Sequence, residues 1–186
     1  MRTLFYMIIA FIMSIGTAHA QRMLPGGRGI EMTAGTLSAK VIGDDFYASL
    51  GMTITGKKGN YQLYALEYSR QQYDYNGNAI PHESFTAQGG YSFYLLGDPG
   101  RTIALHAALS GVAGYEHING GKATLPDGAL LRTENKFIYG GAGRLSLETY
   151  LSDRIVFLVQ GRAQMLWGTS LQQFRPSWGV GLRFNF

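Results

Sequence analysis

The chain has 186 residues, a length that suggests one domain, and its 26 Gly, 12 Tyr and 10 Phe favour strands over helices. Charged residues make up 15% of the chain, below the typical ~25%, and the net charge of +4 comes from scattered basic residues. No Lys/Arg-rich run suggests nucleic-acid binding, and the absence of cysteine excludes disulfides, thiolate metal sites, a cysteine nucleophile and a lipidated N-terminal cysteine.

Residues 1–20 are predicted to form a cleaved secretory signal peptide. Arg2 supplies the positive start, Leu4 to Ile15 the apolar stretch, and Ala18-His19-Ala20 a small-x-small cleavage site. The alternative is a transmembrane anchor, but the apolar run is short for a span of ~20 residues. We therefore expect export, with residues 21–186 as a single mature domain.

The mature chain is predicted to form eight strands joined by connections that alternate between tight and long. Thr55–Asn60, Gly97–Arg101 and Leu151–Arg154 are tight, whereas Ala39–Asp44, Tyr73–His82, Asn119–Asn135 and Gly168–Gln172 are longer or more polar. This alternation is typical of an eight-stranded antiparallel up-and-down outer-membrane β-barrel, which has short periplasmic turns and longer outer loops. The predicted strand cores are Gly29–Ser38, Asp45–Thr55, Asn60–Gln72, Glu83–Leu96, Thr102–Ile118, Lys136–Tyr150, Arg154–Trp167 and Gln173–Phe186.

The last predicted strand has a strict alternation. Trp178, Val180, Leu182, Phe184 and Phe186 fall on one face, and small or polar residues fall on the other. Such a strand, with aromatics ending on a phenylalanine, resembles the C-terminal signal that barrel-assembly machinery reads in outer-membrane proteins. We expect it to close the barrel on the first strand, with Trp178, Phe184 and Phe186 on its outer face.

Period two does not tell which face is inside, and a soluble ligand-binding barrel gives the same alternation. Three features favour the membrane barrel. Most of the predicted strands run to ~10–14 residues, long for a globular sheet. All five lysines lie in connections or at a strand start, and aromatic residues gather near strand ends, as at membrane interfaces.

Charged residues on the polar face are predicted to form a salt-bridge network that fills the lumen. An eight-stranded barrel is just wide enough for side chains to fill, and charges inside it are costly unless paired. Because the last strand closes on the first, we expect Arg183 to face Glu31. A proton or ion path is the alternative. The candidate residues are Glu31, Glu67, Arg144, Glu148, Arg162 and Arg183, with His106 on the same face.

The sequence predicts no catalytic residues, no metal site and no cofactor. His106 and Ser110 share a face, but four residues along a strand span about 13 Å, too far for a serine–histidine pair. His82 with Glu83, and His117 with Glu116, lack a convincing nucleophile, and the histidines are too dispersed for a metal site. We therefore expect a protein that is not an enzyme and has no small-molecule substrate.

Several stretches closely resemble the conjugal transfer protein TraO family of conjugative transposons from Bacteroides and relatives. They are QRMLPGGRGIEMTAG, GNYQLYALEYSRQQYDY, IPHESFTAQGGYSFYLLGD, LSGVAGYE, LSDRIVFLVQGR and QFRPSWGVGLRFNF. The resemblance implies a structural or docking component of the mating apparatus in the outer membrane, where its partners are lipid, barrel-assembly machinery and other conjugation proteins, without direct nucleic-acid binding. The alternative is a generic porin- or adhesin-like barrel with no direct role in transfer.

Overall fold

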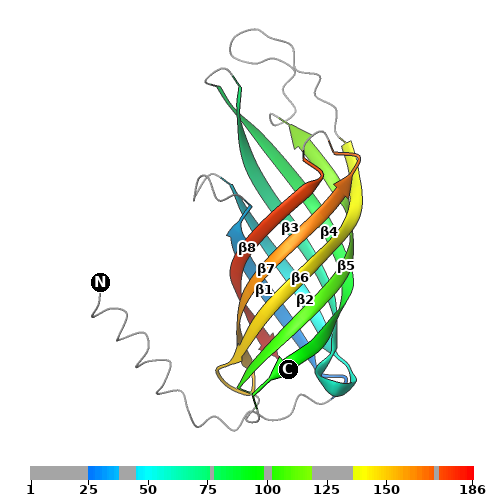
Figure 1. The fold of residues 1–186 in the computed structure, drawn as a ribbon, viewed down its shortest axis with the longest axis vertical. Helices are drawn as coiled ribbons and strands as arrows, with labels where there is room; N and C mark the ends of the chain where they lie inside the picture. Colours follow the sequence, from blue (N-terminus) through cyan, green and yellow to red (C-terminus); the bar gives the residue numbers. More distant parts are fainter. Residues whose placement is uncertain (1–24, 38–44, 76–77, 99–101, 119–135, 170–171) are drawn as a thin grey trace, which may run out of the picture.

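The computed structural model describes residues 25–37, 45–75, 78–98, 102–118, 136–169 and 172–186 (Figure 1). The predicted signal peptide and the predicted loops Ala39–Asp44 and Asn119–Asn135 lie outside these residues. The described residues form eight strands and one short 3-10 turn. These are β1 (Arg28–Thr36), β2 (Phe46–Thr55), η1 (Lys57–Gly59), β3 (Tyr61–Tyr75), β4 (Asn78–Gly97), β5 (Ile103–Ile118), β6 (Lys136–Tyr150), β7 (Ile155–Trp167) and β8 (Phe174–Asn185).

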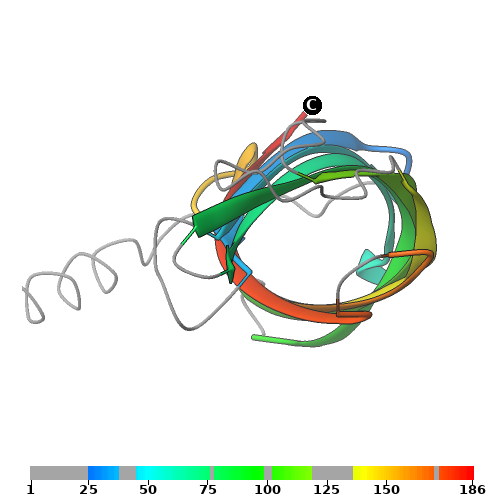
Figure 2. The ribbon, with the colours of Figure 1, turned by 90° about the horizontal axis from the view of Figure 1, so that it is seen from above.

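The strands form a closed barrel in which each strand pairs antiparallel with its neighbours in sequence. The ring closes where β1 pairs with β8, from Gly29 opposite Asn185 to Thr36 opposite Trp178. Two backbone hydrogen bonds between Arg28 and Phe186 extend this seam. Seen from above, the strands make a continuous ring (Figure 2). The predicted eight-stranded up-and-down barrel is confirmed.

The two ends of the barrel differ. The connections from β2 to β3, β4 to β5 and β6 to β7 lie at one end together with the start of β1 and the end of β8; we call this the turn end (Figure 1). At the opposite end, which we call the loop end, β1, β3, β5 and β7 end and β2, β4, β6 and β8 begin. Strands β3 to β6 have 15 to 20 residues, whereas β1 and β2 have 9 and 10. The wall is therefore taller on the side of β3 to β6.

The predicted loop Tyr73–His82 is wrong, because this stretch belongs to a long hairpin. β3 continues to Tyr75 and pairs with β4, with Tyr75 opposite Asn78 and Gln72 opposite Pro81. The sequence between them, Asn76-Gly77, is the dipeptide that two-residue hairpin turns favour, a signal that the composition-based reading of the loop missed. Pairing of β3 with β2 ends at Arg70, and pairing of β4 with β5 ends at His82. A two-stranded ribbon therefore rises above the ring at the loop end (Figure 1).

The barrel wall is apolar outside and polar inside. Among the described residues, 22 polar or charged side chains are buried, against 11 hydrophobic ones. Large hydrophobic side chains are instead exposed around the whole wall, and Leu109, at 68%, is the most exposed of those within the strands. This distribution is the reverse of a water-soluble barrel, whose apolar side chains fill the interior.

Aromatic side chains form rows on the outer wall. Phe46, Tyr68 and Phe85 make successive ring contacts across β2, β3 and β4, with centroids 5.9 and 4.9 Å apart. Tyr115, Phe137, Tyr139 and Trp167 continue the row over β5, β6 and β7, with centroids 5.4 to 6.2 Å apart. Among the described residues, no helix is long and apolar enough to cross a membrane.

Candidate functional site

All six predicted lumen residues lie on the inner face of the wall. The strands place them there because successive side chains point to opposite faces, and each of the six falls on the polar phase of its strand. Glu31, Glu67, Arg162 and Arg183 count among the buried residues, as does Glu148, and Arg144 has a side chain only 9% exposed. The structure places the six residues in two clusters, and further polar residues form a third cluster toward the loop end.

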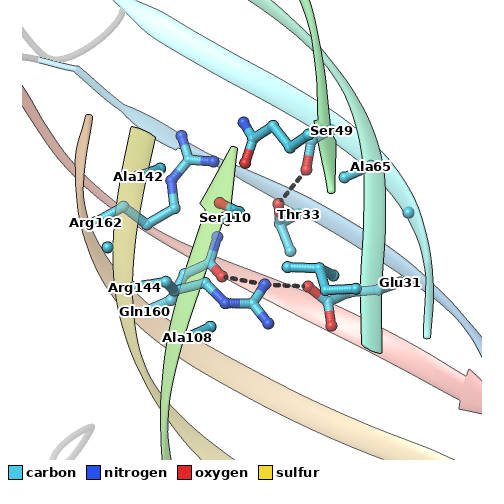
Figure 3. A pocket seen from close by; sticks show the side chains of 14 residues that line it. Glu31, Thr33, Ser49, Ala65, Ala108, Ser110, Ala142, Arg144, Gln160 and Arg162 are labelled. Carbon is cyan, nitrogen blue, oxygen red and sulfur yellow. Dashed lines mark hydrogen bonds and ion pairs between the residues drawn. The ribbon is translucent and has the colours of Figure 1, made fainter. Parts of the chain in front are cut away.

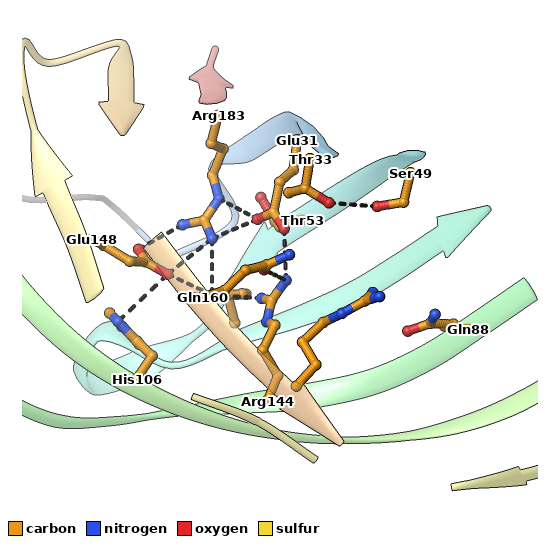
Figure 4. A network of polar contacts seen from close by, with 12 residues as sticks. Glu31, Thr33, Ser49, Thr53, Gln88, His106, Arg144, Glu148, Gln160 and Arg183 are labelled. Carbon is orange, nitrogen blue, oxygen red and sulfur yellow. Dashed lines mark hydrogen bonds and ion pairs between the residues drawn. The ribbon is translucent and has the colours of Figure 1, made fainter. Parts of the chain in front are cut away.

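The turn-end cluster is centred on Arg183, whose side chain is fully buried (Figure 4). Its Nε and Nη2 atoms donate to Glu31 Oε2 at 3.1 and 2.7 Å, so the predicted facing of Arg183 and Glu31 is what the structure has. The same guanidinium donates to Glu148, from Nη1 at 2.8 Å and from Nη2 at 3.0 Å. Arg183 thus bridges two carboxylates from β1 and β6.

Arg144 and Tyr61 complete the turn-end cluster. Arg144 Nη1 donates to the second oxygen of Glu31 at 2.6 Å, and Nη2 donates to the Tyr61 hydroxyl at 3.0 Å. The Tyr61 hydroxyl also accepts a bond from Arg183 at 2.8 Å and donates to Glu148 at 2.6 Å. One hydroxyl therefore joins both arginines and a carboxylate, and its ring lies under the Arg183 guanidinium at 4.3 Å.

His106 connects the turn-end cluster to η1. Its Nδ1 lies 3.5 Å from Glu148 Oε1, and its Nε2 lies 3.2 Å from the carbonyl oxygen of Gly59. The ring also packs against Tyr61 and Tyr94, with centroids 5.3 and 5.6 Å apart. The turn between β2 and β3 is thereby attached to the lumen side chains.

The central cluster pairs Arg162 with Glu67. Arg162 Nη1 donates to Glu67 Oε2, and Arg162 Nε donates to the Ser177 hydroxyl at 3.2 Å. The amides of Gln88 and Gln164 donate to the two oxygens of Glu67 at 3.1 and 3.2 Å. Partners from β3, β4, β7 and β8 therefore meet across the middle of the lumen.

Tyr47 and Gln160 link the central and turn-end clusters. The Arg162 guanidinium lies 3.8 Å over the Tyr47 ring. Gln160 donates to the Tyr47 hydroxyl at 3.0 Å and accepts from Arg144 at 3.3 Å. Gly35 and Gly179 make room for this ring, because a Cβ atom at either position would lie within 2.6 Å of Tyr47.

The loop-end cluster surrounds Glu116, which is fully buried. Arg175 Nη2 lies 3.1 Å from Glu116 Oε2, and the Thr169 hydroxyl donates to the same oxygen at 2.7 Å. His82 Nε2 lies 3.2 Å from Glu116 Oε1. Arg175 also donates to the Thr169 hydroxyl at 2.6 Å and to the Gln172 carbonyl at 3.2 Å.

The charges of the three clusters balance. The turn-end cluster holds two arginines and two glutamates, and the other two clusters hold one of each. Uncompensated charges in such a buried lumen would be costly, whereas paired and hydrogen-bonded ones are tolerated. The arrangement can hold strands together and fill the lumen without attracting ions of one sign.

Side chains fill the lumen between the clusters. A cavity of about 10 Å³ remains between the turn-end and central clusters, lined on one side by small residues such as Ala142 and Ser110 (Figure 3). This volume accommodates about one water molecule. At this level the paired side chains of the two clusters extend into the lumen from several strands.

The structure separates the residues that could suggest catalysis. His106 contacts Glu148 and Gly59, while Ser110 lines the cavity. Among the residues that the structure describes, no group of three or more His, Cys, Asp or Glu side chains could hold a metal ion. What the arrangement offers is a dense set of hydrogen bonds and ion pairs between strands.

Sequence reasoning missed several members of these clusters, among them Tyr47, Tyr61 and Arg175. Each could have been found by extending the period-two pattern of its strand. Arg175 falls in phase with Arg183, and Tyr61 falls in phase with Glu67. Conversely, Tyr150 is an aromatic residue near a strand end, where the sequence predicts interface aromatics, but its hydroxyl donates to Glu148 at 3.5 Å.

Comparison with known protein families gives a match over most of the chain. A family model described as conjugative transposon protein TraO matches residues 24–186. The chain belongs to the TraO family. Among curated proteins, a sequence search gives no match.

Solved structures similar to this TraO chain are outer-membrane barrels. The attachment invasion locus protein Ail of Yersinia pestis has 11% identity and a TM-score of 0.55, covering 88% of this chain and 100% of its own. Neisserial surface protein A has 12% identity and a TM-score of 0.53, covering 86% of this chain and 96% of its own. At these identities the likeness concerns the fold, which is that of small eight-stranded outer-membrane barrels.

Proposed function

We propose that this TraO protein is an outer-membrane barrel component of a conjugative DNA transfer apparatus, with a structural or docking role and no catalytic step. The observation that carries the proposal is the match to the TraO family over residues 24–186, combined with a lumen filled by paired charges. The family connects the chain to conjugative transposons, and the filled lumen favours an anchor over a conduit.

The apolar outer wall supports the location in the outer membrane. Exposure of so many large hydrophobic side chains to water would be unfavourable, whereas lipid would cover these side chains. The aromatic rows match the girdles that such barrels place at membrane interfaces. In this orientation the turn end faces the periplasm, the loop end faces outward, and residues 1–20 direct export.

The ribbon at the loop end is our candidate for docking. Residues 72–75 of β3 and 78–81 of β4 pair with each other but with neither β2 nor β5. An isolated two-stranded ribbon is marginally stable in water, and contact with another protein would stabilise it. The predicted loop Asn119–Asn135, a second candidate surface, lies outside the described residues.

The test is the transfer frequency of a donor that carries an in-frame deletion of this gene. We expect transfer to fall sharply and to return when the wild-type gene is supplied on a plasmid. Membrane fractionation of the complemented donor is expected to place the protein in the outer membrane. Unchanged transfer in the deletion strain would contradict the proposal and favour a generic small barrel without a direct role.

A shortened hairpin tests the docking role separately. Removing residues 72–75 and 78–81 joins Gln71 and His82, which already pair, through Asn76-Gly77, and keeps the barrel register. We expect this variant to insert normally, as judged by heat-modifiable migration in gels, and to support little transfer. Full transfer by the inserted variant would exclude the ribbon as the docking surface.

A further inference from the structure

Two arginines lie directly opposite each other on neighbouring strands inside the barrel. Arg144 of β6 pairs in register with Arg162 of β7, and both side chains point into the lumen. Like charges in this position repel, and the two side chains diverge. Arg144 reaches Glu31 toward the turn end, and Arg162 reaches Glu67 in the middle of the lumen.

The cavity lies where these two side chains part (Figure 3). Arg162 Nη2 and Arg144 Nε are buried and have no hydrogen-bond partner among the described residues. Arg162 has a side chain only 5% exposed, and both arginines line the cavity. The hydroxyls of Thr33, Ser49 and Ser110 line it as well. The site therefore offers buried donors on one wall and hydroxyls on others.

Two properties decide which ligand suits this cavity. A buried N–H of a guanidinium calls for a hydrogen-bond acceptor, since leaving such a group unpaired is costly. The volume of about 10 Å³ corresponds to about one water molecule and is tight for a larger halide ion. Glu31 and Glu67 already neutralise the two arginines, so an added anion would leave net negative charge in the lumen.

We propose that this cavity is a binding site for a single structural water molecule, which accepts a hydrogen bond from Arg162 Nη2 and bonds to the surrounding hydroxyls. The water joins the central cluster to the hydroxyls beside the turn-end cluster and satisfies a donor that no side chain reaches. This site does not depend on the role in transfer, so it is tested on the isolated barrel.

A crystal structure of the full mature barrel, grown once in chloride and once in bromide, tests the ligand directly. We expect a density peak of water strength within hydrogen-bond distance of Arg162 Nη2, without anomalous signal in bromide. A bromide peak would overturn the assignment to water in favour of an anion. A cavity without density would overturn the site itself.

Two substitutions at Ala142, which lines the cavity, give an independent measurement. Ala142→Val would fill the space with methyl groups and displace the water, so we expect its thermal unfolding midpoint to fall by about 4 °C. Ala142→Ser would place a hydroxyl beside Arg162 and is expected to keep the midpoint near that of the wild type. The control is Ala113→Val on the outer wall, which is expected to change nothing. A higher midpoint for Ala142→Val would indicate a dry cavity and contradict the proposal.

Discussion

The turn-end and loop-end clusters hold the same kinds of buried side chain, but they join different parts of the barrel. Arg183 connects β8 to Glu31 across the closing seam and to Glu148 of β6. Arg175 contacts Glu116 of β5, but its other partners belong to the connection that precedes its own strand. The side chains of both clusters are similarly buried. We therefore expect that the contribution of an ion pair to the free energy of unfolding depends on which strands it joins.

The largest effect is expected at Arg183. Arg183→Met removes the cation shared by two buried carboxylates, so we expect a loss of about 3–5 kcal/mol in the free energy of unfolding. Equilibrium unfolding in urea of the barrel refolded into lipid measures this change. A loss below about 1 kcal/mol would mean that the turn-end cluster does not hold the seam.

A charge swap tests whether Arg183 and Glu31 act as an isolated pair or as part of the turn-end cluster. Arg183→Glu with Glu31→Arg would restore stability if the two residues formed an isolated pair. Here the swap also places a glutamate beside Glu148 and an arginine beside Arg144, so we expect the double variant to be no more stable than Arg183→Glu alone. Recovery of heat stability in the double variant would show that the contacts with Arg144 and Glu148 contribute little.

Tyr61→Phe probes the centre of the turn-end cluster with a smaller change. The hydroxyl bonds to both arginines and to Glu148, so its loss is expected to cost about 1–3 kcal/mol in the same urea titration. The matched control is Tyr64→Phe, whose hydroxyl bonds to Gln62 on the exposed face and whose loss is expected to cost less than about 0.5 kcal/mol. Equal losses in the free energy of unfolding for Tyr61→Phe and Tyr64→Phe would contradict the role of the Tyr61 hydroxyl in joining the turn-end cluster.

The smallest effect is expected at the loop end. In Arg175→Met, Glu116 keeps the hydrogen bond from Thr169 and the contact with His82, so we expect a loss of about 1–2 kcal/mol in the free energy of unfolding. If Arg175→Met is as unstable as Arg183→Met, the expected difference between the loop-end and turn-end clusters is contradicted. In that case the burial of the arginine, and not the strands that it joins, would determine the loss in the free energy of unfolding.

Much of the barrel could be predicted because period two determines which face each side chain occupies. The strand number, the antiparallel order and the inner position of Arg183 and Glu31 follow from it. Partner choice across the lumen does not follow, because it depends on strand tilt and on the reach of each side chain. Arg144 of β6 bonds to Glu31 of β1, a strand with which β6 does not pair, and no pattern in β6 indicates this partner.

The ribbon and Tyr61 show two other limits of the sequence. The stretch Tyr73–His82 is polar enough to look like a loop, yet β3 and β4 continue into it and pair as far as Tyr75 opposite Asn78. Tyr61 looks like an interface aromatic by composition, and only its phase in β3 places it inside. In both cases the type of residue predicts the wrong environment. Strand pairing gives the correct one for the ribbon, and the alternation along β3 gives the correct one for Tyr61.

The closing seam has a consequence for the order of folding. Seven of the eight strand pairs join neighbours in sequence, but Arg183 and Glu31 are 152 residues apart. Bringing such distant segments together carries the largest loop-closure entropy in the chain, so the seam is expected to form last. Until that moment Glu31 of β1 lacks Arg183 of β8, so the final step of folding both shuts the ring and completes the neutralisation of its interior.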